Sequence, residues 1–249
     1  MKVREGDRVL LLNPKRKYLV KVEKGKKFCT DLGIINFDDI IGKDYGSFVT
    51  THKGEKFLIA KPRRIDFIEK MIRKPQIIMP KDAGVIAALA GIGKEDVVVD
   101  AGTGSGALAL FLSNIAKKVY TYERRKEFYD VAKKNFENAN AKNVVLKLKD
   151  VCEGIEEKGV DVITIDLDTP EKIIKLAKQA LKPAGFIVIY CPCIEKVKEV
   201  VRRLKDENFI EIKVVECLLR EYEVKVNCTR PKTRMLGHTG YIIFARKFE

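Results

Sequence analysis

The sequence passes from strand to helix through Val97-Val98-Val99-Asp100-Ala101-Gly102-Thr103-Gly104-Ser105-Gly106. The three valines form an apolar run that predicts a buried strand, and residues 105–117 carry apolar side chains at helical spacing. The glycines between them allow the backbone to turn tightly and let a ligand approach the main chain. The helix that follows offers unpaired N–H groups in its first turn. This stretch therefore predicts a strand–turn–helix unit that binds a cofactor.

Apolar runs alternate with amphipathic stretches from residue 76 to the end of the chain. Strands are predicted at 97–99, 119–122, 144–148, 161–165 and 186–190, and helices at 84–90, 105–117, 126–138, 171–181 and 194–206. This alternation predicts a parallel, doubly wound sheet. The last two strands, 210–218 and 240–245, have no helix of usable length between them, which predicts an antiparallel edge. We therefore expect an α/β fold of the Rossmann-like class I methyltransferase type.

Acidic residues follow successive predicted strands at positions suited to a nucleoside cofactor. Asp100 precedes the glycines, Glu123 ends the next strand and Asp150 follows the third. A carboxylate after the second strand accepts hydrogen bonds from ribose hydroxyls, and Asp150 is placed to face an adenine amino group. The loop has the spacing G-x-G-x-G, whereas dinucleotide-binding proteins show G-x-G-x-x-G. The combination predicts S-adenosylmethionine as the cofactor, and a dehydrogenase is the alternative within this fold.

The first part of the chain has a different pattern. Residues 1–64 contain short alternating runs broken by turn signals, and residues 47–60 are typical of a β-hairpin. Residues 65–75 carry apolar side chains at helical spacing. We therefore expect a small N-terminal β-domain over 1–64, a linker helix over 65–75 and a methyltransferase domain over 76–249. The small domain is either a module that contacts nucleic acid or dimerises, or a structural cap on the larger domain.

Several stretches make the sequence similar to one family in particular. They are Gln76–Gly84, Asp100–Leu108, Ile165–Leu167, Tyr190–Cys193, Arg220–Val224 and Gly237–Tyr241. The chain resembles the tRNA (adenine-N1)-methyltransferase family that acts on the T-loop, especially its archaeal branch. The stretches span residue 76 to the end, and the N-terminal β-domain resembles that of the family in length and position. The glycine loop is general, whereas Pro80-Lys81-Asp82-Ala83 and Arg220-Glu221-Tyr222-Glu223-Val224 are much more selective.

The resemblance implies a homotetramer that methylates N1 of a T-loop adenine in tRNA, at position 58 and with position 57 as a second candidate. It assigns Asp166 to the target adenine as the catalytic residue, and Glu123 and Asp150 to the ribose and adenine of the cofactor. Further cofactor contacts are then expected from Gln76, Gly102, Gly104, Ser105, Gly106, Ala107, Leu108, Val151 and Asp166. Two other functions stay open: a class I methyltransferase with another RNA, protein or small-molecule substrate, and a non-catalytic RNA-binding subunit.

The sequence departs from the family pattern in two places. A Pro-Trp pair commonly follows the catalytic aspartate, but here the segment is Asp168-Thr169-Pro170-Glu171, and Leu219 stands where a Trp often precedes Arg220. The residue that stacks on the target base is therefore open between Tyr190 and Tyr222, and either tyrosine could instead be part of the core.

The expected reaction at Asp166 does not require a strong base. N1 of adenine carries its own lone pair, so the main task is to align N1 with the activated methyl group. A carboxylate at Asp166 would orient the exocyclic amino group and stabilise the positive charge that develops on the ring. Proton removal from that amino group is a second role. The alternative is that Asp166 only caps the following turn.

The charge of the chain favours a polyanionic partner. Lys and Arg number 49 against 35 Asp and Glu, which gives a net charge of +14. Candidate phosphate contacts are Arg63, Arg64, Arg230, Lys232 and Arg234, although each is equally consistent with a solvated surface cation. Lys81 is expected either near the cofactor or at the exposed surface. His238 is interpreted as orienting a turn, and His52 as having no catalytic role.

The cysteine spacing and the apolar stretches argue against a metal-binding or a membrane protein. The six cysteines include no C-x-x-C pair, so no metal site is predicted, and whether any of them form disulfides stays open. No apolar stretch approaches the roughly 20 residues of a membrane helix, and the first residues lack a signal-peptide core. We therefore expect a cytoplasmic protein without a membrane anchor.

Overall fold

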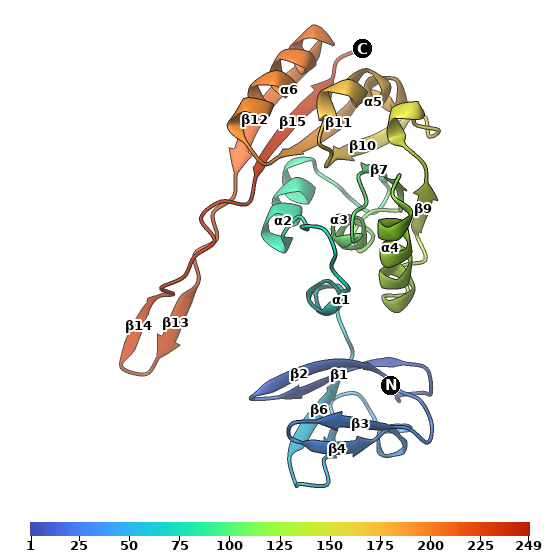
Figure 1. Cartoon of the computed structure of the whole chain (residues 1–249), viewed down its shortest axis with the longest axis vertical. Coiled ribbons are helices and arrows are strands. Elements are labelled where there is room, and N and C mark those ends of the chain that lie inside the picture. The colour runs from blue at the N-terminus through green and yellow to red at the C-terminus, as the bar shows by residue number, and fades with distance from the viewer. The chain divides into compact units, whose positions relative to one another are not determined.

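The computed structural model describes residues 1–249, which form two compact units, Met1–Met71 and Ile72–Glu249 (Figure 1). The first unit is built mainly of strands. Its elements are β1 (Arg8–Asn13), β2 (Arg16–Lys21), β3 (Lys27–Thr30), β4 (Gly33–Asn36), the 3₁₀ turn Phe37–Asp39, β5 (Phe48–Thr50), β6 (Lys56–Ala60) and α1 (Arg64–Lys70). The strands form a four-stranded sheet in the order β2-β1-β6-β5 and a separate β3–β4 pair. The predicted hairpin over 47–60 is confirmed, since β5 and β6 pair antiparallel.

The helix α1 belongs to the first unit and ends at Lys70. Its first turn is capped by Asp66, whose carboxylate accepts a hydrogen bond from the Arg63 amide at 2.7 Å. Lys17 on β2 forms an ion pair with Asp66 at 2.6 Å and another with Glu69 at 2.8 Å. These contacts attach the helix to the β-sheet of the first unit. Met71 is extended and no helix is present between it and α2, so residues 71–75 are not helical.

The second unit is a seven-stranded sheet with helices beside it. Its helices are α2 (Pro80–Leu89), α3 (Ala107–Leu112), α4 (Lys126–Asn138), α5 (Ile174–Ala180) and α6 (Ile194–Asp206), with 3₁₀ turns at Val151–Glu153 and Pro170–Ile173. Its strands are β7 (Val97–Ala101), β8 (Lys118–Glu123), β9 (Val144–Leu148), β10 (Val160–Ile165), β11 (Leu181–Cys191), β12 (Phe209–Glu216), β13 (Tyr222–Lys225), β14 (Cys228–Pro231) and β15 (Tyr241–Lys247). The sheet order is β12-β15-β11-β10-β7-β8-β9.

The central strands are parallel and buried on both faces. β10 pairs in parallel with β7 and β11, and β7–β8–β9 continue the parallel part. Residues such as Val99, Ile163 and Ile189 are fully buried, as expected for strands covered by helices on both sides. The α/β class with a separate β-rich region is therefore confirmed. The parallel arrangement also brings the carboxyl ends of β7, β8, β9 and β10 to the same edge of the sheet, where ligands of such folds bind.

The expected antiparallel edge of the sheet is confirmed. β15 is antiparallel to both of its neighbours, and it lies between β11 and the outermost strand β12. Between β12 and β15 the chain forms an additional hairpin, β13–β14, which the sequence patterns did not predict. Figure 1 shows this hairpin standing away from the sheet, and its Val224 and Val226 side chains are almost fully exposed.

Candidate active site

The glycine loop joins β7 to α3 at the carboxyl edge of the sheet. Gly102 has a φ of +103°, which L side chains rarely adopt, and a Cβ there would overlap the carbonyl oxygen of Asp166. The Asp166 amide in turn donates to the Ala101 carbonyl at 2.9 Å. The end of β10 therefore lies directly against the loop after β7, at a distance that only a glycine permits.

Asp100 is buried beneath this loop and braces the three central strands. Its Oδ1 accepts a hydrogen bond from Thr164 at 2.8 Å and its Oδ2 one from Thr121 at 2.7 Å. Because the Thr121 hydroxyl donates its hydrogen bond to Asp100, Thr103 is the donor in the 2.6 Å contact between the two threonines. Burial raises the pKa of Asp100 to about 6, although the two hydroxyl bonds act in the opposite direction. Both carboxylate oxygens are engaged inside the protein.

Glu123 ends β8 and holds the loop in place. Its Oε2 accepts from the Gly104 amide at 2.9 Å and its Oε1 from the Arg125 amide at 2.9 Å. The side chain is only 3% exposed. A carboxylate oxygen has more than one acceptor position, so each oxygen of Glu123 retains capacity for a ligand hydroxyl.

Asp150 follows β9 and caps the short 3₁₀ turn after it. Its Oδ1 accepts from the Cys152 amide at 2.9 Å. That backbone bond lowers the pKa of Asp150, and the Arg124 guanidinium, 3.6 Å from Oδ2, acts in the same direction. Asp150 is therefore a fixed, ionised acceptor at the rim of the site, suited to an amino group.

Asp166 follows β10 and differs from the other carboxylates. Its carboxylate makes no hydrogen bond to another group of the protein, and the residue is partly exposed. Burial raises the pKa of Asp166 to about 7, and the negative charges of Asp100 and Asp168 act in the same direction. Asp166 is therefore a carboxylate that is available to a ligand and that changes its protonation near neutral pH.

Two adjoining hollows bring these residues together. The larger, of about 430 Å³, is lined by residues that include Gln76, Gly102, Gly104, Glu123, Asp150, Val151, Asp166 and Asp168. The smaller is lined by residues that include Gln76, Ile77, Asp100, Gly102, Gly104, Ser105, Ala107, Leu108 and Asp166. Gly106 lines neither hollow and instead begins α3. The other ten residues expected at the cofactor all line one hollow or both.

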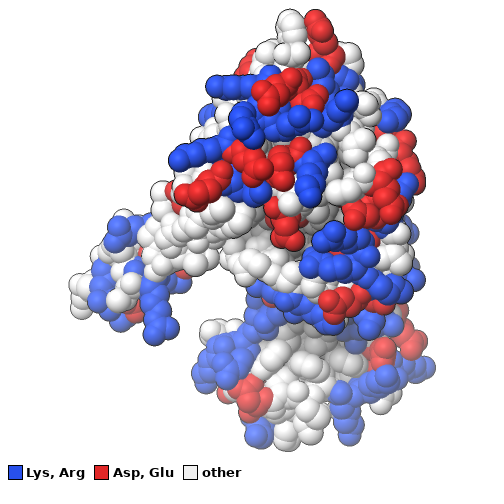
Figure 2. Space-filling model, turned by 45° about the horizontal axis from the view of Figure 1, so that its top comes forward, with Lys and Arg blue, Asp and Glu red and all other residues white.

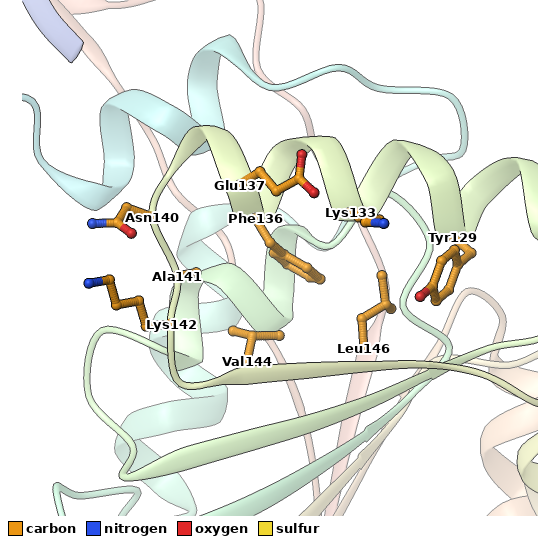
Figure 3. A pocket seen from close by; sticks show the side chains of 9 residues that line it. All are labelled: Tyr129, Lys133, Phe136, Glu137, Asn140, Ala141, Lys142, Val144 and Leu146. Atoms are coloured by element: carbon orange, nitrogen blue, oxygen red, sulfur yellow. The ribbon is translucent and has the colours of Figure 1, made fainter. Parts of the chain in front are cut away.

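A third hollow, of about 480 Å³, lies between α4 and β9 (Figure 3). Its walls include Tyr129, Phe136, Val144 and Leu146, with Lys133 and Lys142 beside them. It shares no lining residue with the hollows at the glycine loop.

The two candidate stacking tyrosines lie in different surroundings. Tyr190 lies at the penultimate position of β11, beside β10, and is partly buried; burial raises its pKa, and the charge of Asp166 contributes in the same direction. Tyr222 lies on the β13–β14 hairpin and is 55% exposed, so it is not a core residue. Of the two, Tyr190 is the one whose position brings it near Asp166.

The remaining candidates have mainly structural contacts. His238 contacts Glu216 at 2.6 Å and the Pro192 carbonyl at 2.9 Å, and the bond to Glu216 raises its pKa. His52 accepts a hydrogen bond from the Ile34 amide at 2.8 Å. Lys81 was expected near the cofactor or at the surface, but its side chain is 11% exposed and lies in a polar network beside α2.

The candidate phosphate contacts lie in both units. Arg63 and Arg64 belong to the first unit, whereas Arg230, Lys232 and Arg234 lie on or next to the hairpin of the second. Arg230 pairs with Glu223 and Lys232 with Glu221. No disulfide joins the six cysteines, and no helix combines the length and apolar character required to cross a membrane.

Comparison with known proteins is consistent across sequence and structure. The family described as the tRNA methyltransferase complex GCD14 subunit matches residues 68–229, and the TrmI-like N-terminal family matches residues 2–49. A tRNA (adenine(57)-N(1)/adenine(58)-N(1))-methyltransferase of Methanocaldococcus jannaschii is 41% identical, over 93% of this chain and 91% of its own. A tRNA (adenine(58)-N(1))-methyltransferase of Thermus thermophilus is 32% identical over 94% of each chain.

Solved structures show the same relationship. A SAM-dependent O-methyltransferase from Thermotoga maritima has a TM-score of 0.91 and 37% identity, covering 100% of this chain and 95% of its own. The tRNA (m1A58) methyltransferase of Aquifex aeolicus has a TM-score of 0.84 and 30% identity, over the whole of both chains. Because the family match covers most of the chain and these relatives extend over almost all of it, this protein belongs to the GCD14 family of tRNA methyltransferases.

Proposed function

We propose that this protein transfers a methyl group from S-adenosylmethionine to N1 of a T-loop adenine in tRNA, at position 58 and with position 57 as a second site. The observation that carries the proposal is the Asp166 carboxylate, which opens onto the same hollows as the glycine loop, Glu123 and Asp150. The names of the relatives from Methanocaldococcus jannaschii and Thermus thermophilus support the tRNA substrate.

The residues at the loop are suited to the cofactor. Gly102 lies against the end of β10, and the glycines of the loop have no side chains. A ligand can therefore lie directly against the loop backbone. Glu123 would accept hydrogen bonds from ribose hydroxyls, and Asp150 one from the adenine amino group. Gln76, Ser105, Ala107, Leu108 and Val151 would complete the walls. When bound, S-adenosylmethionine supplies an electrophilic methyl group on a sulfonium ion.

Asp166 would act on the target base and not on the cofactor. Its carboxylate can accept a hydrogen bond from the exocyclic amino group and so fix the direction of the N1 lone pair. As the ring becomes positive, the negative charge in a partly desolvated site stabilises it more than it would in water. A carboxyl with a pKa of about 7 is also matched to accepting a proton from that amino group at neutral pH.

The surface of the protein suits a large polyanion. Lys and Arg side chains are numerous on the visible faces of both units in Figure 2, in agreement with the net charge of +14. The target base has to leave its stacked position to reach Asp166, so we expect flipping or local opening of the T-loop. We expect the protein to encounter its tRNA substrate in the cytoplasm.

Exposed apolar side chains on and near the hairpin support a homotetramer. Leu218 and Leu219 before the hairpin are 61% and 56% exposed, and Val224 and Val226 on it are 79% and 103% exposed. Such side chains on an extended hairpin favour contact with another chain, because association removes their apolar surface from water.

The proposal is tested by methyl transfer from labelled S-adenosylmethionine to an unmodified tRNA transcript, followed by mapping of the modified nucleoside. Wild-type protein should place the methyl on N1 of adenine 58, and a transcript with guanine at 58 should lose that signal. Asp166→Asn should abolish most transfer while cofactor binding by calorimetry persists, and Asp206→Asn controls for loss of a carboxylate elsewhere. Methyl on a ribose oxygen, or transfer to no tRNA, would contradict the proposal.

A further inference from the structure

A buried polar network lies at the start of α2, next to the candidate active site. The Lys81 ammonium donates to Asp82 Oδ1 at 2.7 Å, to the Cys217 carbonyl at 2.6 Å and to Thr239 Oγ1 at 2.6 Å. An ammonium group has three N–H donors, so all of them are used. Lys81 thereby joins α2 to the chain after β12 and to the chain before β15.

Asp82 is fully buried, and its second oxygen makes no hydrogen bond. The side chain is 0% exposed, and Oδ2 is the only buried side-chain nitrogen or oxygen of the protein that lacks a partner. A buried carboxylate oxygen without a donor is unfavourable. Because Asp82 is fully buried, a neighbouring side chain is the natural source of a donor for this oxygen.

The neighbouring side chain is Tyr190, which is held closely in place. A Cβ on Gly240 would lie 2.6 Å from Cε1 of Tyr190 and 2.7 Å from its hydroxyl oxygen, so the ring packs directly against the Gly240 backbone. Tyr190 follows Ile189 on β11, and Ile189 is paired in register with Ile165, the residue before Asp166. The Tyr190 and Asp166 side chains therefore stand at the ends of adjacent parallel strands.

The donors of Lys81 and Thr239, together with the unpartnered oxygen of Asp82, favour one direction of the Tyr190 hydroxyl. Thr239 accepts from Lys81, which leaves the Thr239 proton free for the Tyr190 oxygen. Burial is the main cause that raises the pKa of Tyr190 to about 12; Thr239 acts as a donor that lowers it, and Asp82 as an acceptor that raises it. A Tyr190 proton directed to Asp82 Oδ2 would give that oxygen a donor and would leave the remaining lone pair of the phenol oxygen for a ligand beside Asp166.

We propose that Lys81, Asp82 and Thr239 form a clamp that holds the Tyr190 hydroxyl as a hydrogen-bond acceptor beside Asp166, so that these two side chains together bind the exocyclic amino group of the target adenine. The inference rests on the proposed function and extends it to substrate specificity. Two acceptors match the two hydrogens of an amino group, whereas the carbonyl oxygen of guanine would face two acceptors and be repelled. Lys81, Asp82 and Thr239 are positioning residues, since they act through Tyr190.

The first test is a double-variant cycle with Asp82→Asn and Tyr190→Phe. Asp82→Asn should lower kcat for tRNA by about 10- to 100-fold, as expected when a reacting group loses its alignment, while the Kd for S-adenosylmethionine changes less than threefold. In the Tyr190→Phe background, Asp82→Asn should lower kcat by less than about threefold, because the hydroxyl that Asp82 positions is already absent. Losses that multiply, or a loss confined to cofactor affinity, would overturn the clamp.

The second test uses Thr239, where folding is less at risk. Thr239→Val keeps the shape but removes the hydroxyl, and Thr239→Ser keeps the hydroxyl. The clamp predicts that Thr239→Val resembles Asp82→Asn and that Thr239→Ser recovers most of the lost kcat. Equal effects of the two substitutions would show a packing role only and would overturn the proposal.

A third measurement does not depend on activity. With ¹³C-labelled tyrosine, the ring signal of Tyr190, identified by its loss in Tyr190→Phe, should titrate at higher pH in the wild type than in Asp82→Asn. An unchanged titration would contradict the contact between Asp82 and Tyr190. If the wild-type protein methylates no tRNA but this titration shifts, the proposed function fails while the clamp stands, so the two failures are distinguishable.

Discussion

The methylation rate should depend on pH through Asp166. Burial raises the pKa of this carboxyl to about 7, and the ionised form is the one that can accept from the adenine amino group. The ionised fraction then increases from about 0.1 at pH 6 to about 0.9 at pH 8, so kcat/KM should rise about tenfold over that interval. Because the reaction requires the charged form of Asp166, activity is lost as the pH falls.

The bound cofactor should move this midpoint in a defined direction. A sulfonium ion near Asp166 favours the carboxylate and lowers its pKa. Since kcat/KM reports the free enzyme and kcat the complex, the midpoint for kcat should lie below that for kcat/KM. Asp168→Asn should also lower the midpoint, because the Asp168 charge contributes to raising the pKa of Asp166. Asp206→Asn, on the exposed end of α6, removes the same charge and should leave the midpoint unchanged.

The assay is initial methyl transfer to tRNA transcript between pH 5.5 and 9, with cofactor affinity measured by calorimetry at each pH. A rate that is flat above pH 5.5, together with no response to Asp168→Asn, would refute the reasoning. In that case Asp166 would be ionised throughout, or its protonation would not affect the step that limits the rate.

Three further predictions concern the loop and the hairpin. Gly102→Ala should abolish measurable cofactor binding and destabilise the fold by about 1–3 kcal/mol, because its Cβ would overlap the Asp166 carbonyl in a left-handed conformation; calorimetry and thermal unfolding measure both. Glu123→Gln should weaken cofactor binding by about 10- to 100-fold, since a charged acceptor of two backbone amides becomes a neutral amide, and unchanged affinity would exclude this role. Val224→Lys combined with Val226→Lys should shift light scattering from the proposed tetramer toward smaller species, while an assembly of unchanged size would show that the hairpin does not hold it together.

The sequence was sufficient for the parts of the fold that have a strong local pattern. Valines at 97–99 followed by spaced glycines predict the turn at the carboxyl end of β7, and a parallel sheet then requires Glu123, Asp150 and Asp166 to meet at one edge. The expected residues line two adjoining hollows because strand order, and not their separation in sequence, determines their distance.

Other features could not be predicted because the local pattern does not contain them. The position of β15 between β11 and β12 depends on how strands are ordered in the sheet. The β13–β14 hairpin has exposed valines where a pattern of burial would have been expected. Lys81 is nearly buried because partners 136 and 158 residues away, Cys217 and Thr239, occupy all its donors, and periodicity carries no information about contacts at that separation.

Hydrogen bonding is the reason that, of the carboxylates at this edge, Asp166 is the one proposed to act on the substrate. Asp100 accepts from two threonines, and Glu123 accepts from two backbone amides. Asp166 lies against the same loop but receives no donor from the protein. A largely desolvated carboxylate without a donor prefers to be protonated, which is why its pKa rises, and a bound amino group would reverse that preference. In the proposed function the site would therefore be more favourable with the target base present than without it. This difference would orient the base, and Asp166→Asn should remove it because an amide does not carry the negative charge that would stabilise the methylated ring.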